Sequence, residues 1–369
     1  MAANERNLKA SFPHEFKLAV DCCRSAFRDS HIAASPMLEQ VDWPRFARLA
    51  EFHRIEGLAA LCVADQTSAP DGIRLTLAGA AARIAARNLQ ASAECRTLLK
   101  SFHSAGVPLL FLKGLTIGAL GYRSAMAKAA VDIDLLIDPA DLRRAAELLR
   151  AAGYSLAAPR DSANDRVLTS WHRCWKESIW AKRSPRLQID LHTRSADNPR
   201  LIPSLSAHSA RQTVDVGNGV QLPTFADEEL FAYLAVHGAS SAWFRLKWIA
   251  DLGGFLSGRS GEEIERLHHR SQELGAGRAA GQALLLADDL FGTLADAPGL
   301  RRALLQDATT RRLYRTAFRL LTREPTEPTD RLLGSLPIRW SQFQLLFGAR
   351  FKLSELSGQV RRMLTRVTV

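Results

Sequence analysis

The chain has 369 residues, of which 47% are hydrophobic and 24% charged, and this length exceeds the usual size of a single hydrophobic core. A globular protein with two or three subdomains and no long disordered arm is expected. The formal net charge of +11 comes mostly from arginines spread along the chain. This charge favours anionic partners such as nucleotides, nucleic acid or a membrane surface, but solvated helix faces account for it equally well.

Cysteine usage and the N-terminus indicate a cytoplasmic setting. The five cysteines, at positions 22, 23, 62, 95 and 174, show no CxxC pair and no Cys/His spacing that suits zinc. The N-terminal residues lack the apolar core of a secretory signal, and no apolar run approaches the roughly 20 residues that a bilayer crossing needs. A protein without a transmembrane segment is expected.

The first part of the chain predicts helices. Asp42 is placed to cap a helix that has Pro44 in its first turn. An alanine-rich segment at 73–104 carries an apolar stripe and is expected to form a long helix that ends before Gly106. Residues 1–104 are therefore predicted to be a helical N-terminal region.

The spacing of apolar residues changes after residue 106, from a helical pattern to one typical of a strand. Residues 107–112 are a short apolar run typical of a buried strand, and Lys113 and Gly114 follow it, before a helix-compatible stretch at 115–120. A strand, a glycine turn and a helix start direct backbone N–H groups and the positive helix end toward one point. This arrangement is typical of anion binding.

An Asp-x-Asp pair lies in the next apolar run, 131–137. Strand side chains alternate between faces, so Asp132 and Asp134 are expected to point the same way. One interpretation is a solvated edge strand; the other is a divalent metal site, because hard carboxylate oxygens bind such ions and the ion cancels their repulsion. Asp138, which follows, suits the start of a helix that continues to Gly153.

A hairpin is predicted further along, with strands at 178–181 and 186–192 joined by a turn at 182–185. Asp190 and His192 share one face of the second strand. If that strand lies beside the Asp-x-Asp strand, a third carboxylate joins the first two. The region 105–200 is expected to hold this small sheet.

Residues 201–369 are predicted to form a helical C-terminal region. Helices are expected at 227–237, 243–256, 261–275, 277–291 and 300–323. A last amphipathic segment, 340–364, suits either a membrane surface or a core or partner-facing helix. The fold class expected from the whole pattern is α+β, with a small mixed sheet flanked by helices.

The ordered motifs support a resemblance to a known family. They are Leu112-Lys113-Gly114, Asp132-Ile133-Asp134-Leu135-Leu136 and Ile189-Asp190-Leu191-His192. Together they resemble the DNA polymerase β-like nucleotidyltransferase superfamily, most closely its bacterial branch of uncharacterised nucleotidyltransferases. The resemblance covers most of the chain up to about residue 255. It implies a glycine turn that holds a triphosphate and three carboxylates that hold divalent metal.

The resemblance implies a role for each matching residue. Asp132, Asp134 and Asp190 would bind two Mg²⁺ (or Mn²⁺) ions, and Asp190 could help to deprotonate the acceptor. The residues implied to contact the nucleoside triphosphate (NTP) or to support the metal are Lys113, Gly114, Thr116, Lys128 and His192. Lys247 and Asp251, four residues apart, suit either a helix ion pair or a helix that covers the nucleotide.

Two residues depart from the family pattern. Leu115 stands where the turn usually carries a second small residue, and Val131 where a glycine often precedes the paired Asp. The leading hypothesis is transfer of a nucleoside monophosphate to a hydroxyl or phosphate acceptor, which is a small molecule, a peptide or nucleic acid. The alternatives are a catalytically silent binding module for nucleic acid or a protein partner, and a peptide- or antibiotic-modifying enzyme.

Overall fold

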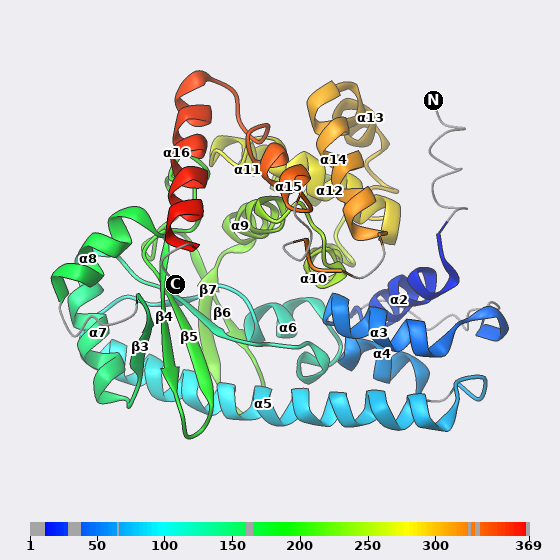
Figure 1. Cartoon of the computed structure of the whole chain (residues 1–369), viewed down its shortest axis with the longest axis horizontal. Coiled ribbons are helices and arrows are strands. Elements are labelled where there is room, and N and C mark those ends of the chain that lie inside the picture. The colour runs from blue at the N-terminus through cyan, green and yellow to red at the C-terminus, as the bar shows by residue number, and fades with distance from the viewer. Residues whose placement is uncertain are drawn as a thin grey trace.

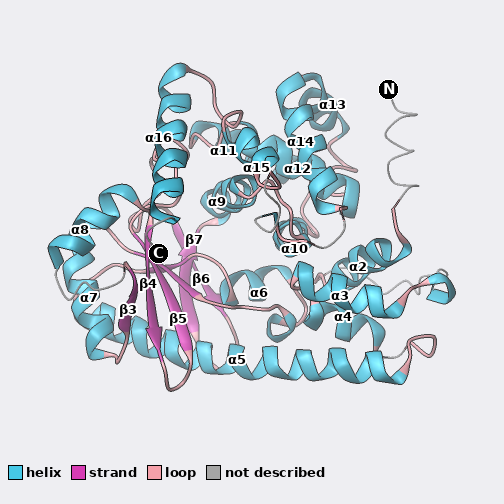
Figure 2. Ribbon diagram, viewed as in Figure 1, coloured by secondary structure: helices cyan, strands magenta, loops and turns pink. Residues whose placement is uncertain are grey.

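A five-stranded mixed sheet with helices around it forms the core of the residues that the computed structural model describes. These residues are 12–28, 38–64, 66–159, 165–323, 326–328 and 333–366. Figure 2 shows the strands gathered at one end of the molecule, with helices beside and above them. The predicted α+β class is confirmed. Residues 1–11, on which the expectation about a secretory signal rests, lie outside the described residues.

The sheet has the strand order β1-β2-β5-β4-β3. Its strands are β1 (Leu110–Phe111), β2 (Ile133–Leu136), β3 (Ser155–Ala158), β4 (Glu177–Lys182) and β5 (Leu187–His192). β2 and β5 are parallel neighbours, and the other neighbouring pairs are antiparallel. β4 and β5 form the predicted hairpin, with Lys182 opposite Leu187. The mixed sheet therefore has β2 as an inner strand.

Helices cover the sheet and form the N-terminal part of the structure. Figure 1 shows α5 (Asp71–Ser104) running beneath the molecule, with the strands over one end and α3 and α4 over the other. The other helices before residue 200 are α2 (His14–Ser25), α3 (Trp43–His53), α4 (Glu56–Val63), α6 (Leu115–Gly121), α7 (Leu142–Ala151) and α8 (Asp165–Cys174), with 3-10 turns at Leu38–Gln40, Ala125–Ala127 and Pro139–Asp141. Asp42 caps α3 as predicted, because its side chain accepts a hydrogen bond from N of Arg45 at 3.0 Å.

The two faces of the sheet pack into different cores, because neighbouring strand residues point to opposite sides. Phe111 and Leu135 belong to a core that includes α7 and the C-terminal half of α5. Leu110 and Leu136 belong to the larger core of the N-terminal and C-terminal helices. Asp134 shares the face of Leu136, so the acidic side of the sheet is directed toward these helices.

The C-terminal part is mainly helical, as predicted. Its helices are α9 (Asp227–Ser240), α10 (Leu246–Leu256), α11 (Gly261–Glu273), α12 (Arg278–Phe291), α13 (Pro298–Gln306), α14 (Ala308–Leu321), α15 (Leu336–Gln342) and α16 (Ala349–Arg366). Figure 1 shows α16 standing above the ends of β4 and β5. The C-terminal helices thus lie on the same side of the molecule as the acidic face of the sheet.

Two helix predictions are wrong in detail. The helix predicted at 300–323 is two helices, because Asp307 ends α13 and its side chain then caps α14 by accepting from two backbone N–H groups. The helix predicted from Trp243 begins at Leu246. Ala242 and Trp243 have φ angles of 46° and 55°, and this left-handed conformation is incompatible with a right-handed helix.

A two-stranded sheet interrupts the region that was predicted to be helical. It consists of β6 (Arg211–Asp215) and β7 (Gln221–Phe225), and β7 packs against β1. The predicted amphipathic segment at 340–364 is divided between α15 and α16 by Gly348, which has a φ of +94°. The side chain of Phe351 on α16 is buried in the larger core.

The division at residues 104 and 200 into three regions stays a prediction. The larger core joins α2 and α3 to the C-terminal helices, and the smaller core joins α5 to the sheet. Along the described stretches, no helix has both the length and the apolar character that a bilayer crossing requires.

Candidate active site

Two parallel strands bring acidic side chains together. In the register of β2 and β5, Asp134 lies opposite Asp190, and His192 follows on the same face. One ligand atom from each of these three residues lies within 4.8 Å of the others. The strand adjacency on which the sequence-based site depends is therefore present. Because β2 is an inner strand and Asp134 is 2% exposed, a solvated edge strand is excluded.

His192 lies between two carboxylates. Its Nε2 is 3.1 Å from Oδ1 of Asp134, and its Nδ1 is 3.3 Å from Oε2 of Glu177. Glu177 lies directly opposite His192 in the β4–β5 hairpin. The imidazole is 2% exposed, and the hydrogen bond between its Nε2 and Asp134 orients the ring, whereas its Nδ1 makes no hydrogen bond within the described part of the chain.

Lys113 reaches into the same group of charges. Its ammonium contacts the carboxylate of Asp134 and lies 3.7 Å from Oδ1 of Asp132. Asp132 precedes β2, and its side chain remains 28% exposed. We call Asp132, Asp134, Asp190 and His192 the carboxylate cluster. Lys113 and His192 together engage both oxygens of Asp134.

The charges of the cluster shift one another's pKa values. Burial alone would raise the pKa of Asp134, but Lys113 and His192 outweigh it and hold that pKa well below its usual range. Burial would lower the pKa of Lys113, and the carboxylates of Asp134 and Asp132 instead raise it well above its usual value. Burial, followed by repulsion from Asp134 and Asp132, raises the pKa of Asp190 to about 7. The cluster therefore holds one firmly ionised carboxylate beside one that takes up a proton near neutral pH.

The glycine turn lies where the sequence predicts it. Gly114 has a φ of +74° and directly precedes α6, and this backbone conformation favours glycine. The side chain of Thr116 is fully buried, and its hydroxyl lies 3.5 Å from the carbonyl oxygen of Lys113, to which it donates. Leu115 is buried as well. The hydroxyl of Thr116 is therefore not available at the surface of the turn.

A cleft rich in lysine borders the carboxylate cluster. We call it the lysine cleft; it is lined by Lys113, Gly114, Lys128, Ala129, Ala130, Val131, Asp132, Leu234, His237, Lys247, Trp248 and Asp251. Its walls come from the glycine turn, from the segment before β2 and from α9 and α10. The sequence-predicted residues Lys113, Gly114, Lys128 and Asp132 thus meet at one surface.

Lys128 is held in place by neighbouring polar groups. Its ammonium lies 3.4 Å from Oδ2 of Asp251, whose other oxygen accepts a hydrogen bond from the Tyr122 hydroxyl at 2.9 Å. The amide of Asn88 donates to the carbonyl oxygen of Lys128 at 2.8 Å. Asp251 therefore pairs with Lys128 and not with Lys247, its neighbour one helical turn away.

Lys247 differs from the other two lysines of the cleft. Within the described residues it has no carboxylate within 4.0 Å, whereas Lys113 and Lys128 are paired. Burial, and then the nearby cations Lys128, Arg54 and Lys113, lower the pKa of Lys247 to about 7. Near neutral pH, Lys247 therefore carries its positive charge in only part of the molecules.

A close backbone contact joins α6, which follows the glycine turn, to α10, which carries Lys247. A Cβ atom added to Gly254 on α10 would lie 2.6 Å from the carbonyl oxygen of Gly121 on α6. One added to Gly121 would lie 3.1 Å from the backbone of Gly254. At this point the helix that follows the glycine turn touches, backbone to backbone, the helix that carries Lys247.

Some residues of this region were not found from the sequence. Glu177 could have been found, because the predicted hairpin turn sets a register that pairs it with His192. Tyr233 and His237, which stack at 5.8 Å on α9, carry no local signal that distinguishes them from core residues. The unpaired state of Lys247 depends on long-range packing and has no signal in the sequence.

The comparisons with known proteins agree with this geometry. A family described as uncharacterised nucleotidyltransferase matches residues 39–292, which is more than half of the chain and includes the carboxylate cluster and the lysine cleft. No curated protein matches the chain. The chain therefore belongs to the uncharacterised nucleotidyltransferase family.

Proposed function

We propose that the protein is a metal-dependent nucleotidyltransferase of the DNA polymerase β-like superfamily. It would transfer a nucleoside monophosphate from an NTP to a hydroxyl or phosphate group of an acceptor. The observation that carries this proposal is the parallel register of β2 and β5, which sets Asp134 beside Asp190 with His192 within 4.8 Å. The family match supports the same class of reaction.

The donor set fits a divalent cation. Asp134 and Asp190 offer the carboxylate oxygens that Mg²⁺ and Mn²⁺ prefer, and His192 supplies a nitrogen that Mn²⁺ accepts more readily than Mg²⁺ does. Asp132 would be a further ligand, since the Lys113 ammonium contacts the carboxylates of both Asp132 and Asp134. Lys113 must leave Asp134 for a cation to bind there. When bound, the metal would supply positive charge against the phosphate oxygens.

The residues in and beside the cluster would have separate roles in proton transfer and in orienting Asp134. Asp190, which lies directly opposite Asp134 in the neighbouring strand, is placed to accept the proton of the acceptor hydroxyl. The acceptor oxygen then forms a bond to the α-phosphorus while the bond from that phosphorus to the bridging oxygen breaks, and pyrophosphate leaves. His192 and Glu177 keep Asp134 oriented during this exchange.

The lysine cleft is the place proposed for the triphosphate. A bound polyphosphate would supply the negative charge that Lys247 lacks, and Lys128 and the Gly114 turn lie on the same surface. Lys113, once released from Asp134, would remain in the cleft beside the phosphates. The half-buried Trp248 offers an apolar wall next to these groups.

Incubation with labelled NTPs and Mg²⁺ or Mn²⁺ tests the proposal. The wild-type chain is expected to show NTP-dependent thermal stabilisation that requires metal, and to release pyrophosphate when a suitable acceptor is present. The double variant Asp132→Asn/Asp134→Asn should lose both signals, whereas the matched change Asp141→Asn, outside the cluster, should keep them. Absence of metal-dependent NTP binding in the wild-type chain would refute the proposal.

One observation favours a second candidate, a catalytically silent binding module. The Lys113 ammonium already neutralises Asp134, so this carboxylate has a counter-charge without a metal ion. Such a module would bind RNA or DNA with a steep salt dependence that survives the loss of both Asp132 and Asp134. Filter binding of the double variant at increasing salt separates the two functions, because the enzyme requires these carboxylates and the module does not.

A further inference from the structure

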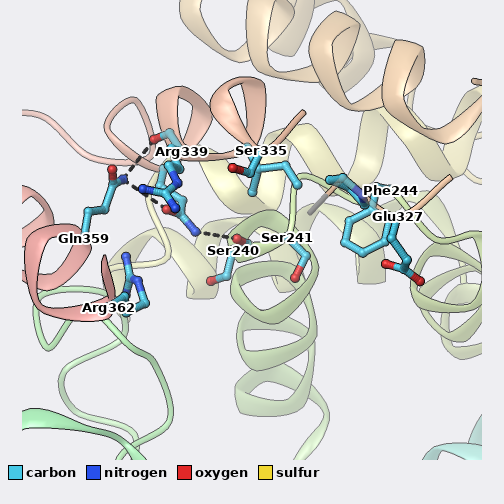
Figure 3. Close-up of a pocket in the computed structure, with 11 residues that line it drawn as sticks. Ser240, Ser241, Phe244, Glu327, Ser335, Arg339, Gln359 and Arg362 are labelled. Carbon is cyan, nitrogen blue, oxygen red and sulfur yellow. Dashed lines mark hydrogen bonds between the residues drawn. The ribbon is translucent and has the colours of Figure 1, made fainter. Parts of the chain in front are cut away.

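A second cavity lies on the far side of the junction between α9 and α10. It has a volume of about 310 Å³, is partly open to solvent and is lined by the end of α9, by Phe244, by Glu327 and Pro328, and by α15 and α16. Figure 3 shows Arg339, Gln359 and Arg362 on one side, Phe244 and Glu327 on the other, and Ser240 and Ser241 below. We call it the α9–α15 cavity. Its volume lies at the lower end of the range of about 300–1,000 Å³ typical of small-molecule sites.

Side-chain amides tie the walls of this cavity together. Nε2 of Gln359 donates to the carbonyl oxygen of Arg339 and to Oε1 of Gln342, each at 3.1 Å. Nε2 of Gln342 in turn donates to the carbonyl oxygen of Ser240 at 2.7 Å. Gln359 is 8% exposed, so this network is internal. α9, α15 and α16 are therefore held together around the space by hydrogen bonds.

The charges that line the cavity do not balance. Glu327 contacts Arg245, and Arg362 lies 2.9 Å from Glu355, so both already have partners of opposite charge. Arg339 is half-buried and, in the part of the chain that the structure describes, has no carboxylate within 4.0 Å. A half-buried guanidinium without a counter-charge is typical of a site that receives an anion.

Neutral polar groups complete the lining. The hydroxyls of Ser241 and Ser335 make no hydrogen bond to the described residues, which leaves them available to a ligand. Phe244 gives the opposite wall an aromatic ring, and this ring packs edge-on against Trp248 of the lysine cleft at 5.1 Å. The cavity thus combines one unbalanced cation, free hydroxyls and an apolar wall.

We propose that the α9–α15 cavity is a second ligand site, which binds a small polyhydroxylated molecule carrying one oxyanion group. Arg339 binds the oxyanion, Ser241 and Ser335 hydrogen-bond to the hydroxyls, and Phe244 packs against the carbon skeleton. This site is separate from the carboxylate cluster and does not depend on the proposed nucleotidyl transfer. Phosphate monoesters and carboxylates share the required chemistry, because both offer two oxygens to a guanidinium.

Calorimetric titration of the full chain with ribose 5-phosphate, gluconate and ribose tests the site. Either anionic polyol is expected to bind more tightly than ribose, and the tighter of the two identifies the oxyanion. Arg339→Met should weaken that binding at least about tenfold, because it removes a charge-assisted hydrogen bond and keeps most of the side-chain volume. Arg315→Met, the same change on the exposed face of α14, should change it less than about twofold.

Two further variants keep the proposal open to refutation. Ser241→Leu fills the cavity without removing a charge and should also abolish binding, which covers the case in which Arg339→Met does not fold. Lys247→Met, in the lysine cleft, should leave binding of the anionic polyol intact. Binding that survives both Arg339→Met and Ser241→Leu, or that is lost only in Lys247→Met, would overturn the proposal, as would no binding at millimolar concentration. None of these results depends on whether the protein transfers nucleotides.

Discussion

The carboxylate cluster and the lysine cleft are neighbours, but they differ in whether their charged side chains have partners of opposite charge. In the cluster, the negative charge of Asp134 is matched within the protein by Lys113 and His192. In the cleft, burial, and then the nearby cations Lys128, Arg54 and Lys113, lower the pKa of Lys247, which has no carboxylate within 4.0 Å among the described residues. Asp134 therefore has its counter-charge within the protein, whereas an anion bound beside Lys247 would add a counter-charge that the described residues do not provide within 4.0 Å. The predictions below test this contrast.

The largest effect is expected from Asp134→Asn. This change removes the one firmly ionised carboxylate of the cluster, and several kcal/mol of transition-state stabilisation depend on metal bound there, so nucleotidyl transfer should fall by roughly a thousandfold or more. Single-turnover rates with Mn²⁺ measure it. The thermal melt of the variant serves as a folding control, and a folded variant with wild-type rates would exclude Asp134 from the reaction.

Lys247→Met should weaken NTP binding about tenfold, because a charge-assisted contact to phosphate is lost. Only the protonated amine binds phosphate, and its pKa in the free protein is about 7, so wild-type affinity should fall as the pH rises through 7 and beyond. The variant should lose this pH dependence. Calorimetry between pH 6 and 9 measures both effects, with Lys247→Arg as a control that stays charged. Equal pH profiles for wild type and variant would contradict this assignment.

A smaller effect, of opposite sign, is expected from Lys113→Met. The ammonium competes with a metal ion for Asp134, so its removal should strengthen Mn²⁺ binding several-fold. The metal-free variant should at the same time melt at a lower temperature, because Asp134 loses a buried partner. Thermal melts over a Mn²⁺ titration report both changes. Weaker Mn²⁺ binding in a folded variant would show that Lys113 supports the metal instead of replacing it.

The smallest effect on the cluster and the cleft is expected from a change at His53, which lies outside both. Its influence on the pH dependence of stability serves as a baseline for the pH experiments. Burial, and then Arg245, lower the pKa of His53 from 6.5 to about 3, and its Nδ1 accepts a hydrogen bond from N of Leu246 at 3.0 Å. The unfolded chain therefore takes up a proton that the folded chain does not. Stability from this group is complete above pH 6.5 and falls by about 1 kcal/mol per pH unit below it. His53→Asn, which keeps an acceptor and does not titrate, should reduce the fall of the denaturation midpoint between pH 6.5 and 5, and His172 and His237, whose pKa values are also lowered by burial, should account for part of what remains.

Local patterns were sufficient for the strands and turns that carry the acidic residues. The β-branched and aliphatic run around Asp134 and the hairpin before Asp190 follow strand periodicity, and Gly114 follows turn chemistry. From the sequence, the parallel pairing of β2 with β5 could only be assumed, and the three-carboxylate site depended on that assumption. Such pairing joins residues 58 positions apart, as in the contact between Asp134 and His192, and no local pattern encodes it.

Other features escaped the sequence for identifiable reasons. β7 is stabilised by packing on β1 and β6 by pairing with β7 and packing on α6, and these contacts override their weak local preference. The break at Asp307 depends on a side-chain cap within an otherwise helical pattern. The pairing of Lys128 with Asp251, rather than of Lys247 with Asp251, depends on how α10 packs against the segment before β2. Helical spacing alone favours the wrong pair.

The contact between Gly121 and Gly254 determines how closely α6 and α10 approach each other. No side chain lies between the two glycines, so α6 and α10 are as close at this point as main-chain atoms permit. A methyl group added at Gly254 would lie 2.6 Å from the carbonyl oxygen of Gly121, so the two helices would have to move apart. The distance between the helix that follows the Gly114 turn and the helix that carries Lys247 is therefore set at this contact by main-chain atoms.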